Sequence, residues 1–208
     1  MVFVSELLQL VLPGAIARYL PVLLFGKHLE DVARNGLETI VIAIVLTLLI
    51  LDLLLLHSTD KVVAKQLISG IIGLVLGSVA FHLIIVLFGA PVVDLWMHTL
   101  LLAIFLSSCV TMPLAIHFGC SPSQWLNLLL HLRIKNLQEW YLVCSSIGAM
   151  LGAYVGAFPI PLDWDRPWQQ WPLTCVYGTL IGHAAGILIS IVRSATSASL
   201  AAKETKKN

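Results

Sequence analysis

The sequence predicts an all-α integral membrane protein, a bundle of about six transmembrane helices with short loops. Of its 208 residues, 59% are apolar and 11% are charged, whereas soluble domains are about 45–50% apolar and about a quarter charged. A helix that crosses a bilayer needs about 20 apolar residues, and six such stretches account for most of the chain. We therefore expect a single polytopic membrane domain without a separate catalytic domain, which takes at least about 50 residues.

The hydropathy pattern along the chain gives the expected spans. The second is the clearest, because Glu38 and Asp52 are the only charged residues between Leu37 and Leu56. The first is the least regular, because charged residues and two prolines interrupt it, and we expect it to be kinked or partly interfacial. The predicted spans are residues 2–25, 36–57, 67–88, 94–118, 140–158 and 172–192, followed by a polar tail over 193–208.

The distribution of Lys and Arg predicts the orientation, because these residues concentrate in short cytosolic loops. The tail and the second and fourth connections carry eight of them, and the first, third and fifth connections carry three. Both termini are therefore expected in the cytosol. The connections over 89–93 and 159–171 then face the lumen or the exterior.

Composition and cysteine spacing argue against two classes of function. The net charge of +1 provides no basic stripe for nucleic acid, so the expected partners are membrane phospholipid and other membrane proteins. The four cysteines show no CxxC or Cys/His spacing typical of zinc. We predict no cofactor and no metal.

Glycines recur at every fourth position in the last two spans, and thus on one face of each helix. Small residues are the usual means of close helix packing in lipid. The favoured interpretation is packing between neighbouring helices of the same chain; the alternative leaves one stripe for a different protein. The stripes are Gly148, Gly152 and Gly156 in the fifth span, Gly178, Gly182 and Gly186 in the sixth, and a shorter version, Ser69, Gly73 and Gly77, in the third.

A short helix is predicted between the fourth and fifth spans. Ser121 can cap it, Pro122 suits the first helical position, and Gln124 completes the spacing of a capping box. Apolar residues then recur at helical spacing from Trp125 to Leu132. This pattern fits a cytosolic helix in the headgroup region, with a loop packed against the bundle as the alternative.

Ionisable side chains at bilayer depth are functional candidates because they are costly there. His183 lies near the middle of the sixth span, and His82 lies in the luminal third of the third span. Asp52 lies close to the cytosolic end of the second span. A structural role is favoured for Asp52, which is expected to reach interfacial water or Lys61. For the two histidines the structural and functional interpretations have equal weight.

Four prolines and three tryptophans mark the connection over 159–172. Pro167 suits the first turn of a short helix, on which Trp168 and Trp171 would share a face. An aromatic belt explains the tryptophans without a ligand. It leaves the charges unexplained: Arg166 is expected to pair with Asp163 or Asp165, and these two acids also form a DxD triplet of the kind that holds a metal in some glycosyltransferases.

Two blocks of sequence resemble the phosphatidylinositol-glycan biosynthesis class F family. The first runs from Gly156 through Asp163-Trp164-Asp165-Arg166-Pro167-Trp168 to Gln169, and the second is Phe81-His82 followed by Gly89-Ala90-Pro91. The resemblance extends over roughly residues 67–192. It implies a multi-pass protein of the endoplasmic reticulum that acts as a non-catalytic stabilising subunit of GPI ethanolamine phosphate transferases, larger catalytic chains that modify the glycan mannoses.

The residues that we expect to form a partner or lipid interface, or a structural motif, come from these blocks and from the glycine stripes. They are Phe81, His82, Gly89, Pro91, Gly148, Gly152, Gly156, Pro159, Pro161, Asp163, Trp164, Asp165, Arg166, Pro167, Trp168, Gly178, Gly182, His183 and Gly186. Two other hypotheses stay open: a lipid transporter or scramblase that uses His82 and His183, and an enzyme with a metal on Asp163 and Asp165.

Overall fold

The computed structural model describes residues 2–56, 62–91, 93–162, 164 and 166–205. Within these ranges all regular structure is helical, and six helical segments are long and apolar enough to cross a membrane. The predicted fold class, an all-α membrane protein with about six spans, is confirmed. The helices are α1 (Val2–Phe25), α2 (Leu29–Leu55), α3 (Val63–Leu87), α4 (Trp96–Cys109), α5 (Thr111–Phe118), α6 (Pro122–Leu129), α7 (Leu137–Ala157), the short 3-10 helix η1 (Pro167–Gln169) and α8 (Leu173–Thr205).

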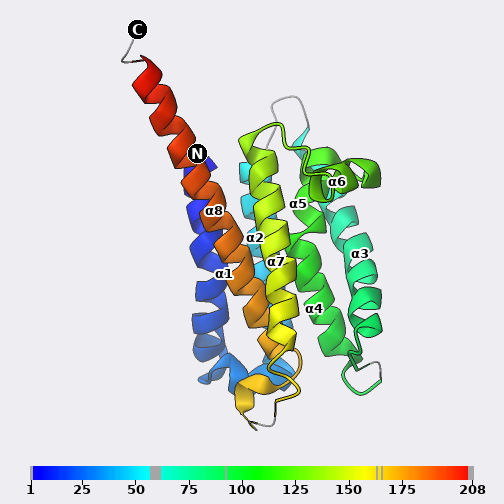
Figure 1. Ribbon diagram of the computed structural model, residues 1–208. Helices are drawn as coiled ribbons and strands as arrows, with labels where there is room; N and C mark the ends of the chain where they lie inside the picture. Colours follow the sequence, from blue (N-terminus) through cyan, green and yellow to red (C-terminus); the bar gives the residue numbers. More distant parts are fainter. Residues whose placement is uncertain (1, 57–61, 92, 163, 165, 206–208) are drawn as a thin grey trace.

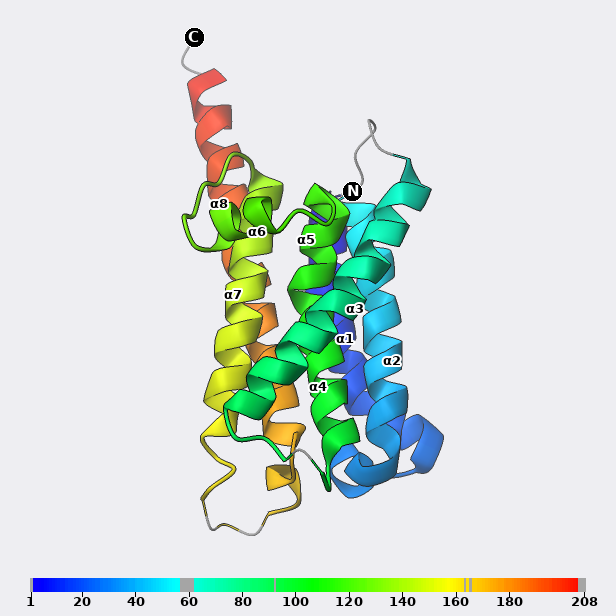
Figure 2. The same ribbon diagram turned by 90° about the vertical axis from the view of Figure 1, so that its right-hand side faces the viewer.

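The long helices run roughly side by side in one bundle (Figures 1 and 2). Helix α8 lies between α1 and α7, and α3 lies on the outside against α4 and α5. The span formed by α4 and α5 is central: 83% of its most apolar stretch is buried, against 22% in α3. The core therefore lies where α2, α4, α5 and α7 meet.

Both termini lie at the same end of the bundle, together with α6 (Figure 1). The opposite end, which we call the distal end, carries the connections between α1 and α2, between α3 and α4, and between α7 and α8. The two blocks of sequence that resemble the family meet there, because one ends in the α3–α4 connection and the other forms the α7–α8 connection.

The fourth span is two helices, separated at Val110, where the expectation was one continuous stretch over 94–118. Val110 has φ −118° and ψ −69°, and its N–H contacts the carbonyls of both Leu106 and Ser107. Pro113 explains the break, because proline has no N–H and its ring collides with the carbonyl four residues earlier unless the proline lies in the first turn of a helix. Pro113 occupies that first turn in α5.

Helix α3 packs closely on this broken span through small residues. A Cβ on Gly73 would overlap the Cβ of Ala115, and one on Gly77 would overlap the hydroxyl of Thr111. The third member of the stripe is Gly70, which meets Ile116, whereas the spacing had pointed to Ser69. Both choices satisfy helical periodicity, and the exact direction of a neighbouring helix decides between them.

The helix predicted after residue 121 is present as α6 and lies against α5 and α7. Two details were wrong. Ser121 makes no capping bond with its side chain, and the helix ends at Leu129, so Leu132 lies beyond the expected apolar face with φ 49°. Trp125 anchors the helix instead, because its indole N–H donates to the carbonyl of Gly119 at 3.0 Å.

Candidate functional site: the distal loop and the α7–α8 interface

The α7–α8 connection, residues 158–172, is a compact loop at the distal end, which we call the distal loop. Turns at Pro159 and Leu162 follow the end of α7, and η1 begins at Pro167 as predicted. Helix η1 ends at Gln169, before Trp171, so the face that Trp168 and Trp171 were expected to share does not form. The two indoles have different surroundings.

Gln169 holds the distal loop together. Its amide N–H group donates to the carbonyl of Pro159 at 2.8 Å and to that of Leu162, and its carbonyl accepts the backbone N–H of Arg166 at 3.1 Å. One side chain thereby satisfies backbone groups on both arms of the loop, which proline-rich segments without regular structure otherwise leave to water. The loop base is fixed by these bonds.

A second set of bonds joins the distal loop to the α3–α4 connection. The indole N–H of Trp171 donates to Thr99 Oγ1 at 3.1 Å, and Thr99 Oγ1 lies 3.2 Å from the carbonyls of both Pro91 and Leu95. Thr99 is fully buried. Pro91 and the distal loop, which lie 67 or more residues apart in the sequence, are thus linked through one hydroxyl.

The tip of the distal loop is exposed. Trp164 is 55% exposed and its ring lies 5.8 Å from that of Trp168, nearly edge to face. Arg166 and Pro161 are also exposed. Asp163 and Asp165 lie outside the described residues. The expected pairing of Arg166 with one of them, and the hypothesis of a metal on the DxD triplet, therefore stay predictions.

The glycine stripes of α7 and α8 face each other. A Cβ on Gly148 would overlap the carbonyl oxygen of Gly182, and one on Gly152 would overlap that of Gly178. The remaining pairs place Gly156 against Thr174 and Gly186 against Cys144. All six glycines therefore allow two backbones of the same chain to touch, which is the internal packing favoured from the sequence.

The other residues singled out from the sequence have definite surroundings. His183 is buried beside this interface, with Nδ1 3.4 Å from the carbonyl of Ser145 and Nε2 without a described partner. Phe81 packs against the core, and Nδ1 of His82 is buried without a described partner. Gly89 has φ 97° at the end of α3, a conformation that favours glycine.

Comparison with known proteins assigns the family. The model of the GPI biosynthesis protein family Pig-F matches residues 8–191. The chain belongs to the Pig-F family. The resemblance read from the two blocks of sequence is thereby confirmed. No solved structure matches the chain.

Individual Pig-F relatives match over part of their length. The human and mouse proteins named "GPI ethanolamine phosphate transferase, stabilizing subunit" are 40% identical over 111 residues and 41% identical over 109. These alignments cover 53% and 52% of this chain, and 51% and 50% of the relatives. A Yarrowia lipolytica protein named "Glycosylphosphatidylinositol anchor biosynthesis protein 11" is 36% identical over 130 residues, 62% of this chain and 56% of its own. The chain thus spans about half the length of the relatives that it matches.

The Pig-F chain also contains a buried polar network between α1, α2 and α7. Gln9 donates to Asp52 Oδ1 at 2.7 Å, and the hydroxyl of Tyr141 donates to Gln9 Oε1 and lies 3.4 Å from Asp52. All three side chains are at most 2% exposed. The expectation that Asp52 reaches interfacial water or Lys61 was therefore wrong about the water, and Lys61 lies outside the described residues.

Sequence reasoning missed Gln9, Thr99, Tyr141 and Gln169 as structural residues. A polar residue inside an apolar stretch was the available signal for Gln9 and Thr99, because such groups need a partner in lipid. Gln169 belongs to the quoted family block, yet nothing in its local spacing indicated that it binds backbone carbonyls on the other arm of the loop.

Proposed function

We propose that this chain is a non-catalytic stabilising subunit of a GPI ethanolamine phosphate transferase of the endoplasmic reticulum. It would support transfer of ethanolamine phosphate to GPI mannoses by a larger catalytic partner. The observation that carries the proposal is the Pig-F match over residues 8–191, which includes the distal loop. The names of the human and mouse relatives support the same role.

The geometry of the distal loop supports a role in binding another protein. Its base is fixed by Gln169 and Trp171, while Trp164 and Arg166 project at the tip. Trp and Arg are the residue types that most often dominate the binding energy of interfaces, and a prearranged loop loses little entropy on binding. We assign the tip of the loop to the transferase contact, on the luminal side of the membrane.

The glycine stripes of α7 and α8 are occupied within the chain and are not part of the proposed contact. The stripes affect the contact indirectly. They hold α7 and α8 together, and the distal loop connects the end of α7 to the start of α8. The partner is then held by the distal loop and by lipid-facing helix surfaces, with membrane phospholipid around the complex.

Copurification with a matched pair of arginine variants tests this proposal. We expect Arg166→Ala to reduce recovery of the transferase about 5–30-fold, the effect of losing roughly 1–2 kcal/mol. The unfolding temperature of the chain should stay unchanged, because Arg166 is exposed. The control is Arg133→Ala. Arg133 is exposed and belongs to the connection between α6 and α7, which lies at the opposite end of the bundle from the distal loop (Figure 1).

Two results would contradict the proposal. Equal recovery of the transferase with Arg166→Ala and Arg133→Ala would remove the distal loop from the contact. Ethanolamine phosphate transfer by the purified chain alone would contradict the assignment as a non-catalytic subunit.

A further inference from the structure

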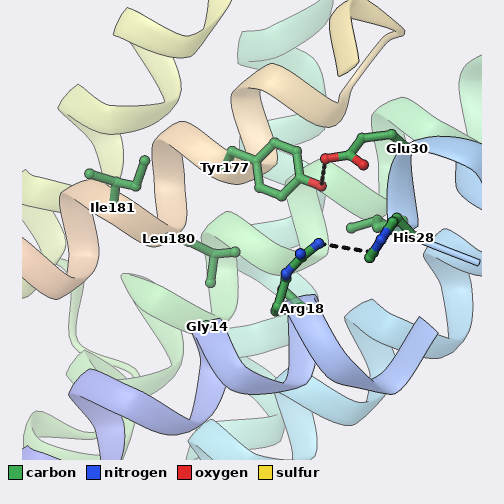
Figure 3. Close-up of a pocket in the computed structure, with 9 residues that line it drawn as sticks. Gly14, Arg18, His28, Glu30, Tyr177, Leu180 and Ile181 are labelled. Carbon is green, nitrogen blue, oxygen red and sulfur yellow. Dashed lines mark hydrogen bonds between the residues drawn. The ribbon is translucent and has the colours of Figure 1, made fainter. Parts of the chain in front are cut away.

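A pocket of about 240 Å³ opens near the distal end, on the opposite side of α8 from α7 (Figure 3). It lies between the last turns of α1, the first turn of α2 and the first turns of α8. A Cβ on Gly14 would meet nothing within 4 Å, so the missing side chain leaves part of this space open. The residues that give the pocket its character are Gly14, Arg18, His28, Glu30, Tyr177 and Ile181.

One wall of the pocket carries the guanidinium group of Arg18. Arg18 lies seven residues before the end of α1, and its Nη1 is 2.9 Å from Nδ1 of His28. Among the described residues no carboxylate forms an ion pair with Arg18. A guanidinium has five N–H donors in a planar fork that matches the oxygens of a phosphate. Most of these donors remain available to a ligand.

The other wall carries an acceptor. Glu30 accepts a hydrogen bond from the hydroxyl of Tyr177 at 3.2 Å through Oε1, and the described structure gives its Oε2 no partner. Figure 3 shows Tyr177 turned toward Glu30 and Arg18 turned toward His28, on two sides of one space. The pocket therefore presents a cationic fork and a carboxylate to the same small ligand.

Exposed apolar side chains continue from the pocket along α1 and α8, away from the distal end. Val11 lies seven residues before Arg18 on α1, and Leu188 lies seven residues after Ile181 on α8, so each pair shares a helix face. Val11, Ile181 and Leu188 are 60%, 71% and 51% exposed. Pockets that enclose a whole drug-sized ligand measure about 300–1,000 Å³. The smaller volume suits a polar headgroup whose acyl chains lie outside, along these exposed side chains.

We propose that this pocket binds the headgroup of a zwitterionic phospholipid that carries a primary amine. The phosphate lies on Arg18 and His28, the ammonium group on Glu30, and the acyl chains along α1 and α8. The site lies apart from the distal loop tip, and it does not depend on the proposed function.

Native mass spectrometry of the purified full-length protein in detergent tests the site, with three probes added separately. The probes are phosphatidylethanolamine, phosphatidylglycerol and inorganic phosphate. We expect the protein to retain phosphatidylethanolamine in preference to phosphatidylglycerol, and inorganic phosphate to bind at least tenfold more weakly. Binding of inorganic phosphate as strong as that of the lipid would overturn the assignment to a lipid.

Three variants separate the parts of the proposal. Arg18→Gln should weaken binding of both lipids about tenfold, because it removes the positive charge that faces the phosphate. Glu30→Gln should weaken binding of phosphatidylethanolamine alone and abolish the preference. Gly14→Leu should block the pocket without a change of charge.

Arg133→Gln, at the opposite end of the bundle, is the matched control and should bind both lipids like the unaltered protein. Unchanged lipid binding in Arg18→Gln and Gly14→Leu would overturn the proposal. Arg18 would then be a side chain that extends to the membrane interface, where water hydrates it. If Arg18→Gln fails to fold, Glu30→Gln and Gly14→Leu still decide the question, because neither removes a charged partner of Arg18.

Discussion

The hydroxyl of Tyr141 joins three helices at a single point. It donates to Gln9 on α1 and lies 3.4 Å from Asp52 on α2, and Gln9 in turn donates to Asp52. In lipid such bonds contribute about 0.6 kcal/mol each on average. A network in which every side chain is buried costs more to break, because the groups that remain lose their partner without access to water.

At the residue scale we therefore predict that Tyr141→Phe destabilises the protein by about 1–3 kcal/mol, the cost of leaving a buried polar group without its partner. The measurement is thermal unfolding of the purified protein in detergent. Tyr154→Phe is the matched control: Tyr154 lies on the same helix, is 56% exposed, and its hydroxyl makes no bond in the described structure. Equal unfolding temperatures for the two variants would show that the network contributes nothing to stability.

At the element scale, α7 and α8 form a single unit. The six glycines have no side chains that would hold the two backbones apart. Ser145 and His183 lie beside the contact. Helices in lipid gain their association from such close packing, since burial of apolar surface provides no driving force there. The distal loop begins at one of these helices and returns to the other, so its geometry depends on this contact.

We predict that Gly182→Leu separates α7 from α8 and costs about 1–3 kcal/mol or more, the usual range for overpacking. A Cβ at position 182 already overlaps the carbonyl oxygen of Gly148, and neither backbone can yield as a flexible side chain would. Ala185→Leu, on the exposed face of α8, adds the same side chain and should leave the unfolding temperature unchanged. Equal unfolding temperatures would contradict the packing of the stripes.

The sequence predicted the helices and the stripes because hydropathy and four-residue spacing are local patterns. The pairing of Gly148 with Gly182 is a tertiary contact. The spacing alone allowed two interpretations, packing within the chain and a stripe that binds another protein. The break at Val110 was predictable in principle from Pro113, since the effect of a proline on its own helix is local. The roles of Thr99 and Gln169 were not, because both depend on carbonyls brought close by the fold.

At the scale of the whole molecule, the six spans place both termini at one end and the distal loop at the other. The pocket between α1, α2 and α8 also lies close to the distal end. A transferase that contacts the loop tip and a phospholipid held between α1 and α8 would then lie on the same side of the membrane. The two proposals are therefore compatible, although each is tested by different residues.

The side on which the distal loop lies can be tested with a glycosylation tag. The sequence contains no Asn-X-Ser/Thr acceptor, so a tag with a flexible spacer inserted after Leu162, which is 44% exposed, reports one position. Because Lys and Arg are more frequent in the tail and in the second and fourth connections than in the other connections, we expect this tag to be glycosylated in the lumen. The same tag after Asn208 should remain unmodified. The reverse result would place the loop in the cytosol, and it would exclude contact of the loop with any luminal part of a transferase.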